Sequence, residues 1–438
     1  MNAFAAETSC APVSKRFWPE QFSARHFAEY WPTVATEFSV LVSQILSYKL
    51  AAYFLGQQGF SEYAVVRRAV SLISPLPLLG MAVGLPRYIA YSNGVGDRAA
   101  TERYYGATLR CVVSAIALCV LLLNILKAKF SFLIFGDRAY SELILPLSVL
   151  VAGASLHSLV YSYFRGHLAM TRANILQFTN LGLVPIVCFV VLRLPVQRFL
   201  LILGGAWLLI ASIALFSTPV RNVAVPAKRE TAELLRYGLQ RLPGDFILIG
   251  LLSVPVIFVA HRGGLEQAGY VAFAISVLSM IGAFFGPIGL ILLPKASALL
   301  AAGKKDVLRV HVNRLVKVAI TVSAIATVLI CVFARFFIRA YLGTGFEQAV
   351  GTMQWVVLGA VPYALFTILR NLIDAFHRNA VTAVITMGSF GVFALGIWIP
   401  VGQLAGGREV LLAFLLALMA LGGAAWVECN RILRHEPE

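Results

Sequence analysis

Residues 105–126 read YGATLRCVVSAIALCVLLLNIL, and this stretch decides what kind of fold the chain adopts. Arg110 is its only charged residue, and small and aliphatic side chains fill most of the remaining positions. About 20 consecutive apolar residues in a helix cross the ~30 Å hydrocarbon layer of a bilayer. The stretch therefore predicts a membrane-spanning helix.

Stretches of the same kind recur along the whole chain. Of its 438 residues, 59% are apolar and only 13% are charged, against roughly 25% charged in a soluble domain. The twelve predicted spans are 33–55, 64–86, 105–126, 142–164, 175–192, 199–218, 243–260, 268–293, 315–334, 349–369, 380–400 and 410–427. We therefore expect an all-α membrane protein with about twelve transmembrane helices and no soluble domain.

The placement of Lys and Arg predicts the orientation. Alternate connections carry 23 basic residues on the side of both termini and 9 on the other side. Because membrane insertion leaves basic loops in the cytoplasm, both termini are predicted to be cytoplasmic. The net charge of +16 is spread over these short connections. It favours anionic membrane lipids as partners and gives no sign of nucleic-acid binding.

The chain is predicted to contain two six-helix lobes. A shift of 205 residues places Gly59 on Gly264 and the pair Gly84-Leu85 on Gly289-Leu290, and the tetrapeptide at 114–117 recurs at 323–326. These matches indicate a duplication. The predicted segments are an N-terminal segment with an interfacial helix, a first lobe, a basic cytoplasmic linker, a second lobe and a cytoplasmic tail, at 1–32, 33–218, 219–242, 243–427 and 428–438.

Four ionisable residues inside the predicted spans are candidate substrate-binding groups: Lys49, Arg67, Arg68 and His157. Each costs at least ~2.5 kcal/mol when it faces lipid, so such groups tend to face protein or water. Other interpretations stay open. The long stems of Lys49, Arg67 and Arg68 can reach the headgroups, and His157 can be a hydrogen-bonded core residue.

Candidate gate or hinge residues come from interrupted helices and from helix ends. Pro75, Pro77 and Pro287 lie within the second helix of each half, where proline removes a backbone donor and bends the helix. Arg165 and Arg370 lie beside aromatic residues at the end of the fourth helix of each half. Interrupted helices in corresponding positions of two repeats point to a transport path. Ordinary packing kinks and interfacial aromatic belts are the alternative explanations.

Enzyme motifs are missing from the sequence. It contains no Walker A loop, dinucleotide fingerprint, nucleophile elbow or zinc spacing. We therefore expect a protein that is not an enzyme and that uses neither a cofactor nor a metal.

Short patches of the sequence resemble a known family. The stretch from Leu50 to Tyr63, LAAYFLGQQGFSEY, is similar to the end of helix one and the start of helix two in polysaccharide transporters of the multidrug/oligosaccharidyl-lipid/polysaccharide (MOP) flippase superfamily, which read ARxLGPxxYG there. The ending Gly84-Leu85-Pro86-Arg87 and the turn at 163–166 also resemble that family. Ala64 departs from the pattern, because the family usually has glycine at its position.

The resemblance implies a function. It implies a two-lobed MOP/MATE-like transporter that flips a lipid-linked oligosaccharide, carried on undecaprenyl diphosphate, across the bacterial inner membrane. Such transport serves the synthesis of surface glycans such as lipopolysaccharide and exopolysaccharide, with glycan polymerases or glycosyltransferases as possible partners. One alternative is a cation-coupled multidrug antiporter of the same superfamily, and another is a scaffold for a glycan assembly complex that transports nothing.

Overall fold

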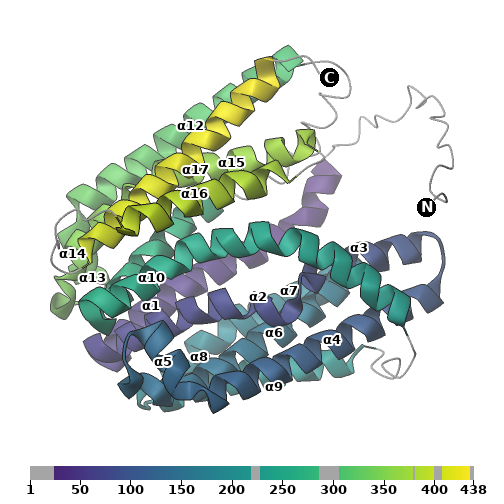
Figure 1. The fold of residues 1–438 in the computed structure, drawn as a ribbon, viewed down its shortest axis with the longest axis horizontal. Helices are drawn as coiled ribbons and strands as arrows, with labels where there is room; N and C mark the ends of the chain where they lie inside the picture. Colours follow the sequence, from purple (N-terminus) through teal and green to yellow (C-terminus); the bar gives the residue numbers. More distant parts are fainter. Residues whose placement is uncertain (1–23, 219–226, 286–304, 378–379, 399–406, 435–438) are drawn as a thin grey trace.

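A computed structural model describes residues 24–218, 227–285, 305–377, 380–398 and 407–434, and within these ranges the regular structure is entirely helical (Figure 1). The helices of the first half are α1 (Ala24–Ile73), α2 (Pro75–Leu78), α3 (Met81–Gly94), α4 (Arg98–Ile125), α5 (Lys127–Phe135), η1 (Arg138–Leu143), α6 (Ile144–Gly166), α7 (Met170–Gln177), η2 (Phe178–Leu183), α8 (Val184–Val191) and α9 (Val196–Phe216). The helices of the second half are α10 (Lys228–Phe284), α12 (Lys305–Val332), α13 (Ala334–Tyr341), η4 (Thr344–Phe346), α14 (Ala349–Val357), α15 (Ala360–Phe376), α16 (Val381–Trp398) and α17 (Arg408–Arg434).

The long helix α1 is two helices that fold back on each other at Gly56. The ring centroids of Tyr48 and Tyr63 lie 5.9 Å apart, whereas 15 residues of straight helix would separate them by about 22 Å. Gly56 has φ 67° and ψ −170°, a conformation that is essentially restricted to glycine. The first two predicted spans are therefore a hairpin.

The long helix α10 folds back in the same way at Gly264, which has φ 81° and ψ 170°. Arg68 donates to Ser276 on one arm of α10 and also lies in a small pocket with Ser253 on the other arm. A straight helix would hold residues 253 and 276 about 34 Å apart. The seventh and eighth spans thus repeat the hairpin of the first and second.

The helix boundaries show the duplication more clearly than the sequence does. Helices α4 and α12 begin at Arg98 and Lys305 and end at Ile125 and Val332, a constant offset of 207 residues. The short helices α5 and α13 that follow them begin at Lys127 and Ala334, which keeps this offset. The breaks at Gly56 and Gly264 are 208 residues apart, so the counterpart of Gly264 is Gly56. The sequence comparison had paired Gly264 with Gly59, which is wrong.

The number of spans agrees with the predicted fold class. In the described ranges, nine helices are long and apolar enough to cross a membrane, or ten when the bent pair α14 and α15 is one span. Two of these contain the hairpins at Gly56 and Gly264, so the chain has about twelve spans. The multi-pass helical membrane fold is confirmed, while the cytoplasmic placement of the termini stays a prediction.

The first lobe and the second lobe lie on either side of the paired hairpins. In Figure 1, α4, α6 and α9 lie below α10, while α12, α15, α16 and α17 lie above it. Helix α10 begins at Lys228, so the second part of the predicted linker is continuous with the seventh span.

The second span is interrupted where its prolines predict a bend. Helix α1 ends at Ile73, Pro75 and Pro77 lie in the one-turn helix α2, and Gly80 has φ 72° before α3 begins. The hydroxyl of Ser155 donates to the carbonyl oxygen of Ser74 over 2.8 Å. A serine on α6 thus satisfies backbone that the break releases, which is how broken helices are tolerated at membrane depth.

Candidate functional site

Arg67 and Arg68 lie where the two hairpins meet. Arg67 donates to the hydroxyl of Tyr63 over 3.0 Å, and its guanidinium carbon lies 5.7 Å from the ring centroids of both Tyr63 and Tyr48. Arg68 reaches across to the second lobe and donates to Ser276 Oγ over 2.8 Å. The adjacent arginines therefore point in different directions, one within its own lobe and one between lobes.

Both arginines are half-buried, and neither forms an ion pair with a residue in the described ranges. Their hydrogen-bond partners are neutral hydroxyl and carbonyl groups. Removing a charge from water costs several kcal/mol unless a partner compensates it. The structure therefore brings two of the four predicted binding residues together as a positive centre between the lobes.

An apolar cavity of about 460 Å³ opens next to this centre. Its walls come from α1, the second arm of α10, α12 and α13, and they include Tyr48, Phe273, Met280, Phe337 and Tyr341. The hydroxyl of Tyr48 forms a hydrogen bond with Ser276 Oγ, which also accepts a hydrogen bond from Arg68. One side chain therefore separates an apolar space from the arginine pair, an arrangement that suits an amphiphile.

The lobes are latched at the end that carries Gly56 and Gly264. Gln57 donates to Glu266 and to the hydroxyl of Tyr270. Ser61 approaches Gly269 so closely that a Cβ on that glycine would lie 2.5 Å from the Cα of Ser61. These contacts hold the two hairpins together at one membrane face.

His157 is a hydrogen-bonded core residue of the first lobe. It is 3% exposed, its Nε2 lies 2.9 Å from Gln177 Oε1 and its Nδ1 lies 3.2 Å from Asn180 Nδ2. Gln177 in turn extends its amide toward the exposed carboxylate of Glu37, 3.5 Å away. The imidazole is thus linked through one glutamine to an acid on the exposed side of α1.

Glu62 is a candidate that the sequence analysis missed. Its side chain is 3% exposed, Gln58 donates to Oε1 over 3.0 Å, and Oε2 has no hydrogen-bond partner among the described residues. It lines a pocket of about 860 Å³ with Arg193, whose guanidinium stacks 3.9 Å above the ring of Phe54. Glu62 lies only five residues before Arg67, but its burial depends on the hairpin, which its spacing does not reveal.

The other predicted residues have varied surroundings. Lys49 is exposed on α1, and its side chain forms no hydrogen bond or ion pair with any residue in the described ranges, so its role stays a prediction. Arg165 and Arg370 each lie over an aromatic ring four residues earlier, at 5.7 Å from Tyr161 and 6.0 Å from Phe366. Pro287 lies outside the described residues.

Known proteins share this architecture. The MatE family model matches residues 246–399. A multidrug resistance MATE family transporter of the MOP superfamily in an inward-facing conformation superposes with a TM-score of 0.77 at 14% identity, over 90% of this chain and 94% of that chain. The eukaryotic MATE transporter AtDTX14 gives 0.65 at 12% identity, over 94% and 98%.

A further solved structure of the same fold is described as having a binding pocket of reverse polarity. It is a MOP superfamily transporter from Pyrococcus furiosus, for which a binding pocket of reverse polarity suggests a different function. It superposes with a TM-score of 0.59 at 15% identity, over 93% of this chain and 96% of that chain. A search of curated proteins finds no significant sequence match. The chain therefore has the fold of the MATE transporters of the MOP superfamily, and its second lobe carries the match to the MatE model.

Proposed function

We propose that this protein is a cation-coupled antiporter that exports organic solutes through a membrane by alternating access. The MatE match and the fold shared with multidrug resistance MATE transporters favour this function over lipid-linked oligosaccharide flipping, which the sequence resemblance had implied. Those similarities are distant in sequence, so the proposal depends on the groups that this chain places in its first lobe.

The link from Glu37 through Gln177 to His157 carries the proposal. An antiporter needs a group that takes up the coupling ion in one state and releases it in the other. Here an exposed carboxylate, which can take up a proton, is joined by the hydrogen bonds of Gln177 to a buried imidazole, so that protonation of Glu37 changes the hydrogen bonding of His157 in the core of the lobe. We propose that a proton enters at Glu37 and is held in the first lobe while the solute leaves.

The latch at the end that carries Gly56 and Gly264 supports the same cycle. With Gln57, Ser61 and Arg68 all in contact with α10, this end of the molecule is closed. The transporter that superposes with a TM-score of 0.77 is described as inward-facing. We infer that the structure represents the inward-facing state and that export requires these contacts to open.

The test is transport by the full-length protein in liposomes with an imposed proton gradient. Wild-type protein should accumulate a fluorescent organic cation against its gradient, and Glu37→Gln and His157→Gln should each lose the gradient-driven part. Glu142→Gln, which changes an exposed carboxylate far from this link, is the matched control. Equal transport by all four proteins would contradict the proposal, and coupling to a sodium gradient alone would exclude the proton.

A second candidate is flipping of a lipid-linked anionic glycan. Arg67 and Arg68, which form no ion pair with any described residue, favour it. A diphosphate would compensate both guanidinium groups, and the apolar cavity beside Tyr48 would accept part of a lipid tail. Movement of an undecaprenyl-diphosphate-linked oligosaccharide in the same liposomes, lost in Arg67→Gln and Arg68→Gln, would establish it. Failure of this assay alongside active cation export would leave the antiporter.

A further inference from the structure

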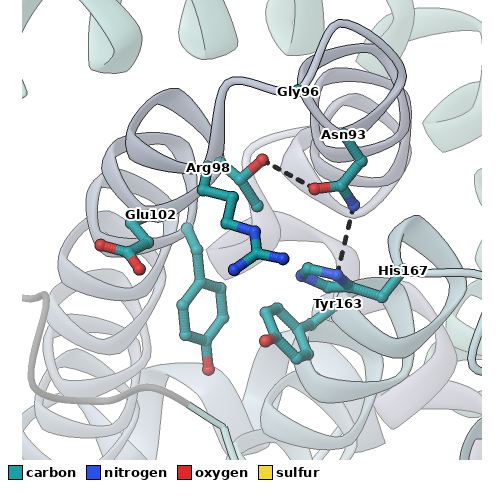
Figure 2. Close-up of a pocket in the computed structure, with 8 residues that line it drawn as sticks. Asn93, Gly96, Arg98, Glu102, Tyr163 and His167 are labelled. Carbon is teal, nitrogen blue, oxygen red and sulfur yellow. Dashed lines mark hydrogen bonds between the residues drawn. The ribbon is translucent and has the colours of Figure 1, made fainter.

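A second polar pocket lies in the first lobe, away from the arginine pair. It has a volume of about 550 Å³ and is formed where α3 ends, α4 begins and α6 ends (Figure 2). The connections at this end of the lobe belong to the more basic side of the chain, which we expect in the cytoplasm. Because α4 begins at Arg98 and then spans the membrane, the pocket lies near headgroup depth.

Hydrogen bonds fix the orientation of the imidazole in this pocket. Thr101 donates to Asn93 Oδ1 over 3.1 Å, which turns the amide nitrogen of Asn93 toward His167 Nδ1, 3.3 Å away. Nδ1 therefore accepts a hydrogen bond, and Nε2 carries the proton of the neutral ring. Desolvation lowers the pKa of His167, which keeps the ring neutral at pH 7. His167 thus presents a fixed N–H donor.

Two opposite charges line the pocket without pairing. Figure 2 shows the guanidinium of Arg98 directed toward His167 and Tyr163, with Glu102 further along the same helix. Arg98 and Glu102 are four residues apart, a spacing at which helical charges often pair. Neither side chain forms an ion pair or hydrogen bond with any residue in the described part of the chain.

We propose that this pocket binds the phosphoethanolamine headgroup of a membrane phospholipid. Arg98 and the Nε2–H of His167 bind the phosphate, since a guanidinium and an N–H are both donors to phosphate oxygen. Glu102 accepts hydrogen bonds from the ammonium group, which two carbon atoms separate from the phosphate oxygen.

The pocket selects this zwitterion over related groups by charge and hydrogen bonding. Glu102 repels the second negative charge of an inorganic phosphate, and it meets only neutral hydroxyl donors on the uncharged glycerol of an anionic lipid, which form weaker hydrogen bonds than an ammonium group does. A choline headgroup carries its positive charge without an N–H, so it forms no hydrogen bond with Glu102. Specificity of this kind comes from a polar group left unpaired by the wrong ligand.

Binding to the full-length protein in detergent tests the proposal independently of transport. Native mass spectrometry would compare retained phosphatidylethanolamine, phosphatidylcholine and phosphatidylglycerol, and calorimetry would use soluble glycerophosphoethanolamine, glycerophosphocholine and inorganic phosphate. We expect wild-type protein to prefer both ethanolamine ligands. Arg98→Gln should weaken the binding of every phosphate-bearing ligand by roughly tenfold, the loss expected for one hydrogen bond to a charged group.

Glu102→Gln should abolish only the preference for ethanolamine over choline and glycerol. Arg434→Gln and Glu142→Gln make the same charge changes at exposed positions on α17 and η1, and should bind like wild type. Competition by inorganic phosphate as strong as that by glycerophosphoethanolamine would overturn the zwitterion proposal in favour of a simple anion site. Unchanged binding in both pocket variants would overturn the site altogether.

Discussion

Ser61 and Gly269 touch each other from corresponding positions of the two repeats. They are 208 residues apart, the same offset that relates the hairpin breaks at Gly56 and Gly264. Any side chain at position 269 would overlap the backbone of Ser61, with its Cβ 2.5 Å from the Cα. The two halves of the duplication therefore cross at their closest point, where backbone meets backbone and small residues are required.

This contact predicts that Gly269→Ala weakens the closed latch. The added methyl group forces the hairpins apart, and overpacking of this kind costs about 1–3 kcal/mol. The melting temperature of the purified protein should fall, and disulfide cross-linking between cysteines at positions 57 and 266 should become slower. Gly388→Ala is the control, because nothing lies within 4 Å of a Cβ there. Equal effects of the two substitutions would show that the crossing is not tight.

The neighbouring arginines should differ in their effect on lobe closure. Arg68 donates to Ser276 and to the carbonyl oxygen of Ala272 in the second lobe, whereas Arg67 bonds Tyr63 in its own lobe. Loss of a hydrogen bond from a charged group costs about 1.5–3 kcal/mol, so Arg68→Gln should shift the closed population by about tenfold or more. Spin-label distances across the latch would measure this shift. Arg67→Gln is the matched control, and an equal shift in both variants would contradict the assignment.

The buried carboxyl of Glu62 predicts a glutamine variant that is at least as stable as the wild type. Oε2 has no hydrogen-bond partner in the part of the chain that the structure describes, and an unsatisfied buried polar atom costs about 1–3 kcal/mol. Glu62→Gln keeps an acceptor for Gln58 and removes the ionisable group. It should therefore unfold at the same or a higher temperature than wild type. A marked fall in melting temperature would mean that the carboxylate has a stabilising partner in the folded protein.

The first turns of α10 should detach from the first lobe at acid pH. Hydrogen bonds from Tyr104 and Arg229 lower the pKa of the Glu233 carboxyl below its ordinary value of 4.5. Because docking lowers this pKa, the ionised carboxylate stabilises the docked form at every pH above the ordinary pKa of the group. This contribution is lost as the pH falls through the lower pKa that the group has in the folded protein. Hydrogen exchange in residues 228–239 should therefore be independent of this group between pH 7 and 5.

Below pH 4.5, protection of these residues should decrease in the wild type beyond the intrinsic change in exchange rate. In Glu233→Gln the same segment should be less protected at pH 7 and should show no such additional step. An identical low-pH profile in the two proteins would mean that Glu233 does not control docking.

Part of the candidate site could be predicted from the sequence. Arg67 and Arg68 stand out because a charge inside an apolar stretch is costly, and the break at Pro75 and Pro77 follows from proline chemistry alone. Glu62 could not be recognised, because its burial depends on which face of the second span meets the first lobe. The register of the repeat was wrong by three residues at Gly264, since small residues are so frequent in membrane helices that neighbouring alignments look alike.

The amino-acid sequence is enough to predict a helical bundle in a membrane with about twelve spans and a duplicated half. Apolar stretches of ~20 residues leave a helix as the way to satisfy their backbone in lipid, and this constraint acts locally. Three relationships become visible only in the folded chain. Arg68 bonds the second lobe while Arg67 stays in the first, His157 is linked to Glu37, and Arg98 and Glu102 line one pocket without an ion pair to any described residue. These relationships depend on how helices rotate and cross, and packing between residues far apart in the chain sets that geometry.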